Sequence, residues 1–255
     1  MPKSKDAKQQ ACAPSSLILA CYFSPVRQAL CTKENLYLNL LQKTIQETLP
    51  DSMSIPEPLV KLFDWIENNG LAEDTEIGRV GYLYPIEKMR NEWTDSQRPG
   101  GTSIEFYAEA QSDDFYFVHK GIENRLRIFA RTGGDGSVAA FWLDDNGEQK
   151  IVHIGSGSGS MLACVLAEDA VDFLRLIATG YDEICWNEDF DKTPFECFKE
   201  NEFTVKPNLK FQDWVVHEFQ TTIPKTALEI VKAPAEFGDE NSGDIFCEWL
   251  EKNGA

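Results

Sequence analysis

The sequence predicts an α+β fold, in which helices pack on an antiparallel β-sheet of about six strands. Between about residues 75 and 167, short segments with period-two apolar residues follow one another, separated by Gly, Asp, Asn or Ser. Segments with helical apolar spacing lie on both sides of this region. The apolar content of 42% in 255 residues is enough to bury a sizeable core.

Two helices are expected before the strands. The stretch "NLYLNLLQKTIQETLP" has helical spacing and stops at Pro50, with one face formed by Tyr37, Leu40, Leu41, Thr44 and Thr48. The next helix has prolines in its first turn and Gly70 after its last turn. Its core stripe follows the i, i+3, i+4, i+7 rule through Leu59, Leu62, Phe63 and Ile66.

The strand region is expected to be an antiparallel meander. Period-two segments predict strands at residues 75–85, 103–110, 115–120, 125–131, 137–143, 149–154 and 161–167. Asn146 and Gly147 can supply the two positive-φ residues of a type I′ hairpin turn. This turn would join the strands at 137–143 and 149–154.

The tract Gly155–Ser160, "GSGSGS", is interpreted as a hairpin loop rather than a phosphate-binding loop. A dinucleotide loop needs glycine where Ser160 stands, and it must open onto a helix, whereas "MLACVLA" reads as a strand. Neither a GxSxG nucleophile elbow nor the Gly-Lys-Ser/Thr ending of a P-loop is present.

Three further helices are expected after the strands. The first follows Glu168 and Asp169, carries an apolar face of Val171, Leu174, Ile177 and Ala178, and ends at Gly180. The others are expected near Leu209–Phe219 and around "SGDIFCEWLEKNG". The expected organisation is an N-terminal helical extension (1–54), an α+β core (55–184) and a C-terminal acidic and helical elaboration (185–255).

The formal net charge of −18 arises from 24 basic and 42 acidic residues. Residues 1–50 contain six basic and three acidic side chains, so the remaining residues carry a net charge of −21. This sign disfavours nucleic acids and anionic membranes, because binding to phosphates needs Lys and Arg, and it suits a basic protein partner.

The seven cysteines favour a reduced, cytoplasmic compartment, since their number is odd and no CxxC pair occurs. Histidines 119, 153 and 217 are too scattered to form a zinc site, so neither a metal nor a cofactor is expected. The apolar run Leu17–Ala20 before Cys21 is too short for an export signal, and no run is long enough to span a membrane.

From about Pro58 to Ile184 the chain resembles the SUKH superfamily of bacterial toxin-immunity proteins and a yeast cell-wall-synthesis regulator. The resemblance is carried by "DWIENNGL", "GYLYP", "LRIFARTGGDGSVAAFWLDDNGEQKIVHI" and "DAVDFLRLIATGYDEI". It implies a curved antiparallel sheet with packed helices, and binding rather than catalysis. Many bacterial members neutralise a cognate toxin, often a nuclease.

The sequence is therefore compatible with three functions. The first is a non-catalytic immunity protein that neutralises a basic toxin, and the alternative is a regulatory interaction scaffold. A hydrolase ranks last, since adjacent carboxylates such as Glu188 and Asp189 point to opposite faces of a strand and no histidine lies near them in the sequence. The oligomeric state is left open.

Acidic residues with a neighbouring tryptophan are the expected contacts for a basic partner, since acids steer association and a buried aromatic residue anchors it. The expected partner-binding residues are Asp113, Asp114, Asp144, Asp145, Asp182, Glu183, Trp186, Glu188, Asp189 and Asp191.

Overall fold

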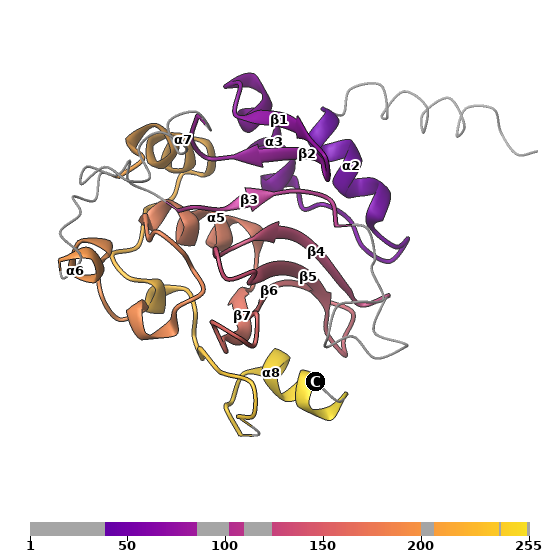
Figure 1. Cartoon of the computed structure of the whole chain (residues 1–255), viewed down its shortest axis with the longest axis vertical. Helices are drawn as coiled ribbons and strands as arrows, with labels where there is room; N and C mark the ends of the chain where they lie inside the picture. Colours follow the sequence, from indigo (N-terminus) through magenta and orange to yellow (C-terminus); the bar gives the residue numbers. More distant parts are fainter. Residues whose placement is uncertain (1–38, 86–101, 110–123, 200–206, 240, 254–255) are drawn as a thin grey trace, which may run out of the picture. The chain divides into compact units, whose positions relative to one another are not determined.

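The computed structural model describes residues 39–85, 102–109, 124–199, 207–239 and 241–253. Its centre is a seven-stranded sheet in which every strand pairs antiparallel with its neighbour in sequence, in the order β1 to β7 (Figure 1). The sheet is open, with β1 at one edge and β7 at the other. The α+β class expected from the sequence is confirmed.

The strands have unequal lengths. Their bounds are β1 Ala72–Thr75, β2 Gly78–Tyr82, β3 Glu105–Phe106, β4 Leu126–Arg131, β5 Val138–Leu143, β6 Gln149–Ile154 and β7 Ala163–Ala167. The expected strand at 75–85 is instead a hairpin of β1 and β2, turning at Glu76 and Ile77. The expected strand at 115–120 lies outside the described residues.

The helices that precede the sheet pack on one of its faces. In α2 (Leu40–Thr48), Asn39 caps the first turn by accepting from the Gln42 amide, and the buried apolar side chains are Leu41 and Ile45 rather than Leu40. In α3 (Glu57–Asn68), the expected stripe of Leu59, Leu62, Phe63 and Ile66 is completely buried, which confirms that prediction.

Helix α5 (Ala170–Thr179) covers the same face. Asp169 caps it by accepting from the Val171 and Asp172 amides, and Gly180 ends it with a φ of 103°. The expected helix at Leu209–Phe219 is α7, which packs against α5 and brings Trp214 to the core residue Trp65. Between them lie η1 (Asn187–Asp189) and α6 (Pro194–Phe198).

The chain then turns through η2 (Ala227–Glu229) to the terminal helix α8 (Ile245–Lys252). Alternate side chains of β5 separate the two faces of the sheet. Phe141 faces the core under α3 and α5, whereas Trp142 packs with Phe246 and Trp249 of α8. Figure 1 shows α8 beside β7, so the C-terminal helix covers the far edge and part of the second face.

The C-terminal segment also closes the edge of the sheet. Residues 161–163 pair with residues 235–237. The Ala163 amide donates to the Ala235 carbonyl, and the Phe237 amide donates to the Met161 carbonyl.

Residues Asn39–Ala255 form one compact unit. The expected boundaries at 54/55 and 184/185 stay a prediction. No helix among the described residues has the length and apolar character that crossing a membrane requires.

A buried histidine lies at the end of β6. His153 Nδ1 lies 2.8 Å from the Leu162 carbonyl and Nε2 lies 2.9 Å from Thr132 Oγ1. Because a carbonyl only accepts, Nδ1 carries the proton and Nε2 accepts from the threonine hydroxyl. Burial lowers the pKa of His153 to about 4, despite the Leu162 carbonyl, which raises it. The imidazole is therefore neutral at pH 7.

Candidate functional site

One end of the sheet brings together the β5–β6 hairpin, the end of β7 and the start of α8. Lys150 of β6 pairs with Glu168, which follows β7, and lies 3.6 Å from Glu148 of the hairpin. Two pockets open here, on either side of Ile245. We call them the edge pocket and the hairpin pocket, and the two together with their acidic rim are the α8 site.

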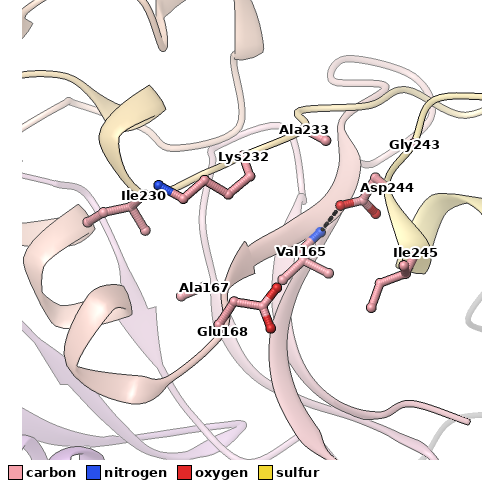
Figure 2. Close-up of a pocket in the computed structure, with 9 residues that line it drawn as sticks. All are labelled: Val165, Ala167, Glu168, Ile230, Lys232, Ala233, Gly243, Asp244 and Ile245. Atoms are coloured by element: carbon pink, nitrogen blue, oxygen red, sulfur yellow. Dashed lines mark hydrogen bonds between the residues drawn. The ribbon is translucent and has the colours of Figure 1, made fainter. Parts of the chain in front are cut away.

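The edge pocket has a volume of about 120 Å³. Figure 2 shows Val165, Ala167 and Glu168 of the β7 end on one side of it, with Ile230, Lys232 and Ala233 on the other. Gly243, Asp244 and Ile245 complete its lining. The edge of the sheet is thus hollowed immediately beyond the point where residues 235–237 stop covering it.

Asp244 fixes α8 to the sheet. Its Oδ1 accepts from the Phe246 and Cys247 amides at the start of the helix, and its Oδ2 accepts from the Val165 amide of β7 at 2.9 Å (Figure 2). The residue is only 4% exposed. Burial raises the pKa of this carboxyl, and the three N–H groups oppose the rise. The Asp244 side chain therefore caps α8 and also accepts a hydrogen bond from a backbone amide at the edge of the sheet.

The hairpin pocket, of about 210 Å³, lies between the β5–β6 hairpin and α8. Trp142 and Trp249 line it, with ring centroids 5.4 Å apart. Trp142 is 2% exposed, and its Nε1 is buried without an acceptor among the described residues. A buried unpaired N–H is unfavourable by about 1–3 kcal/mol. This donor is therefore an exception that needs an explanation.

Asp144 shapes the hairpin from within. Its Oδ1 accepts from the Asn146 amide at 2.8 Å and from the Glu148 amide at 2.9 Å, and the residue is buried. The Gly147 amide donates to the Asp144 carbonyl, and Gly147 has a φ of 82° whereas Asn146 does not have a positive φ. The expected type I′ turn is wrong, because the Asp144 side chain organises a different turn with one positive-φ residue.

The charge state of Asp144 follows from these contacts. Burial raises the pKa of this carboxyl, but the amides of Glu148 and Asn146 outweigh burial, and the pKa lies below its ordinary value. The hairpin pocket is therefore lined by an ionised carboxylate.

The rim of the α8 site is acidic and exposed. The Asp145 side chain is 80% exposed and pairs with Arg125 at 2.8 Å, and the Arg125 guanidinium lies 5.0 Å from the centroid of the Trp249 ring. Glu148 and Glu168 are also exposed, and Glu248 lies 3.9 Å from Lys252. Ile245, 48% exposed, stands between the two pockets. The site thus combines an exposed apolar residue, aromatic walls and carboxylates.

Glu183 and Trp186, two more of the expected partner-binding residues, lie at the opposite end of β5. Glu183 Oε1 accepts from the Gly134 amide at 2.7 Å, in the connection that leads into β5, and Glu183 Oε2 accepts from Trp186 Nε1 at 2.9 Å. The six residues of β5 span roughly 20 Å between this connection and the hairpin. The structure therefore places Asp144 and Asp145 at one end of the sheet and Glu183 at the other.

The contacts of that second group are mainly internal. Asp182 accepts from the Ser103 hydroxyl, and Asp189 pairs with Lys192 at 3.0 Å. Glu188 and Asp191 are exposed. Asp113 and Asp114 lie outside the described residues. Of the residues expected from the sequence, Asp144 and Asp145 line the hairpin pocket.

The Gly155–Ser160 loop joins β6 to β7, and it surrounds a carboxylate of this chain. Asp135 Oδ2 accepts from the Ser156 hydroxyl and the Ser160 amide, each at 2.8 Å, and Asp135 also binds the Ser137 amide and hydroxyl. A Cβ at Gly159 would lie 2.7 Å from Asp135 Oδ2. The tract is thus a hairpin loop, as expected, whose donors hold an internal anion.

Several residues of the α8 site were not expected from the sequence. They are Trp142, Glu148, Glu168, Ile245, Glu248 and Trp249. A signal existed for α8, because Asp244 stands where a helix cap is expected and Ile245 and Trp249 share one face at i, i+4. No group of three or more His, Cys, Asp or Glu in the described part of the chain has a geometry that would hold a metal ion.

The chain was compared with protein-family models, curated proteins and solved structures, and none of them matches it. The SUKH resemblance stays an expectation from the sequence.

Proposed function

We propose that this chain is a non-catalytic binding protein that binds a basic protein partner at the α8 site. The observation that carries the proposal is the exposed Ile245 between two pockets, inside a rim of Asp145, Glu148, Glu168 and Glu248. Binding energy at protein interfaces concentrates in apolar and aromatic anchors that fill pockets, while surrounding charges set the association rate and the choice of partner.

The finer proposal is an immunity protein that neutralises a basic toxin in the cytoplasm. Three observations support it: the resemblance to the SUKH superfamily, the antiparallel sheet with packed helices that this resemblance implies, and the net charge of −21 on residues 51–255. A basic nuclease carries a cationic cleft for its substrate, and an acidic protein that covers such a cleft blocks it. A regulatory scaffold is the alternative.

The first experiment isolates the partner from the native cell with the tagged chain at low and at high salt. Three baits run in parallel: wild type, Ile245→Asp, and Glu188→Gln/Asp191→Asn. The proposal expects a basic protein that is retained by wild type, released by salt and lost with Ile245→Asp. If the Glu188/Asp191 variant loses the partner and Ile245→Asp keeps it, binding occurs at the opposite end of the sheet and the proposed site is wrong.

The second experiment measures association kinetics with the purified partner. The rim variant Asp145→Asn/Glu148→Gln/Glu168→Gln is compared with Glu57→Gln/Glu76→Gln/Asp213→Asn, which removes the same charge from exposed residues outside the α8 site. The rim variant should lower the association rate constant about threefold to tenfold and flatten its salt dependence. Equal effects of the two variants would assign the steering to net charge alone. A partner without toxic activity would favour the scaffold.

A further inference from the structure

The two edges of the sheet are covered differently. At β7, the Ala163 amide donates to the Ala235 carbonyl and the Val165 amide donates to Asp244, so later residues of the chain close that edge. At the other edge, β1 pairs with β2, and Figure 1 shows β1 as the outermost strand. Within the described part of the chain, no segment pairs with the outer side of β1.

The pairing of β1 with β2 shows which backbone groups point outward. The Tyr82 amide donates to the Leu71 carbonyl at 2.9 Å, one step before Ala72 in the register. In an antiparallel pair, residues that are hydrogen-bonded to the neighbouring strand alternate with residues whose N–H and C=O groups point away. Glu73 therefore directs its backbone groups to β2, whereas Ala72 and Asp74 direct theirs to the open edge.

The outward backbone groups of Ala72 and Asp74 are the observation that points to a ligand. They are two N–H and two C=O groups in a row, and no described residue donates to them or accepts from them. The Asp74 side chain is 75% exposed, so this part of the edge is accessible. An extended segment that lies along β1 would satisfy all four groups, which is how open sheet edges bind peptides.

A second copy of this chain is a poor occupant of the edge. Pairing that uses all four groups would place Ala72 opposite Asp74 of the second copy, and Glu73 opposite Glu73. Like charges directly opposite one another destabilise a strand pair. Shifting the register by two residues places Asp74 opposite Asp74 in one direction, and in the other direction only Ala72 stays paired within β1.

The charges at the edge favour a basic segment instead. Glu73 and Asp74 lie within β1, and the exposed Glu76 follows it. Arg79 reaches Asp74 at 3.2 Å, but its Nε and Nη2 atoms bind Glu67 at 3.1 and 2.5 Å, so its charge is shared between two acids. Lys or Arg side chains opposite the acids of β1 would add favourable cross-strand pairs.

We propose that the β1 edge binds an extended basic segment of another protein, added as a further antiparallel strand with Lys or Arg opposite Glu73 and Asp74. The four outward groups of Ala72 and Asp74 supply the hydrogen bonds, and the two acids select the segment. The same acids keep β1 from pairing with a second copy, as charged residues on edge strands do. This proposal goes beyond the α8 site and does not depend on it.

The test uses a short peptide and the full chain. In Ac-Thr-Lys-Lys-Val-Thr-amide, the first lysine would stand opposite Asp74, the second opposite Glu73 and the valine opposite Ala72. Binding is followed by ¹H–¹⁵N NMR of the backbone amides. We expect a Kd on the order of 1 mM, with shifts of the Ala72 and Asp74 amides. The same peptide with glutamates in place of both lysines should bind at least tenfold more weakly.

Backbone methylation of the peptide separates strand addition from charge attraction. A methyl group on the amide nitrogen of the first lysine removes the donor to the Asp74 carbonyl, so it should weaken binding at least tenfold. The amide of the second lysine, opposite Glu73, points away from β1, and its methylation should change binding less than about twofold. Equal binding of the two methylated peptides would show that no strand forms and would overturn the proposal.

Variants of the chain test the same contacts from the other side. Asp74→Asn keeps the outward amide and should weaken the lysine peptide severalfold, whereas Asp74→Pro also removes that amide and should abolish binding. Glu57→Gln, an exposed acid at the other end of α3, should change nothing. If Asp74→Pro does not fold, the two methylated peptides decide.

Two further results would contradict the proposal. The lysine peptide, at concentrations well above 1 mM, could leave the Ala72 and Asp74 amides unshifted, and the edge would then be guarded rather than used for binding. Alternatively, these two amides could shift as the chain alone is concentrated, and the occupant would then be a second copy.

Discussion

The buried histidine predicts a specific loss of stability in mild acid. Burial lowers the pKa of His153 to about 4 in the folded protein, whereas an unfolded histidine has a pKa of about 6.5. Between these two values the unfolded chain binds a proton that the folded protein excludes. The stabilising effect of the neutral imidazole is therefore complete above pH 6.5 and is lost as the pH falls toward 4.

The magnitude follows from the two pKa values. Lowering the pH from 7 to 5 should reduce the free energy of unfolding by about 2 kcal/mol through this group, and the loss should reach about 3 kcal/mol below pH 4. The measurement is urea unfolding at a series of pH values for wild type and His153→Gln. The difference between the two curves removes the contribution of every other titrating group.

The refuting result is a pair of parallel curves, in which wild type and His153→Gln lose the same stability between pH 7 and pH 5. If His153→Gln does not fold, NMR titration of the wild-type imidazoles decides the matter instead. One of the three histidines should then stay neutral, with a proton on Nδ1, down to about pH 4. A set of three histidines that all titrate near pH 6.5 would contradict the burial argument.

Three substitutions test other contacts by urea unfolding. Asp135→Asn should lower the free energy of unfolding by about 1–3 kcal/mol, because a neutral amide cannot accept every hydrogen bond that the Gly155–Ser160 loop and Ser137 donate. An unchanged free energy of unfolding would mean that the loop keeps its structure without the carboxylate. Gly159→Ala should lower it by about 1–3 kcal/mol, since the new Cβ would lie 2.7 Å from Asp135 Oδ2, and a change below about 0.5 kcal/mol would show that the loop yields. Trp142→Phe should change the free energy of unfolding by less than about 1 kcal/mol, because removal of the unpaired N–H offsets the loss of ring volume. A large loss of stability would show that Nε1 has an acceptor in the folded chain.

Local patterns were sufficient to predict most elements of this fold. The stripe of α3, the glycine stop of α5 and the bounds of α7 all follow from spacing and capping that can be seen in the sequence. Strand β1 was missed because "AEDT" contains two acids, which strands usually disfavour, and it forms through pairing with β2. Its stability is a tertiary effect that a short window does not show.

The site was harder to predict, because its contacts join distant residues. The sequence excluded a phosphate loop at Gly155–Ser160 for sound reasons, yet nothing local indicated that Asp135, some twenty residues earlier, would fill the loop. Asp144 resembled a surface acid beside an Asn-Gly turn, and the structure uses it to build that turn. Glu248 meets the hairpin only because α8 packs on the second face of the sheet, and Glu168 meets Lys150 because β7 pairs with β6.

The attachment of β7 to the chain's last segment has a consequence for biosynthesis. The Val165 amide donates to Asp244, which lies 79 residues later in the chain, and residues 161–163 likewise pair with the much later residues 235–237. During translation the final strand therefore emerges long before its covering segment, with unpaired amides that can recruit another chain. Premature termination before residue 235 should give aggregates rather than a smaller soluble fragment, and ribosome-bound chaperones would be expected to shield this strand until residues 235–244 have emerged.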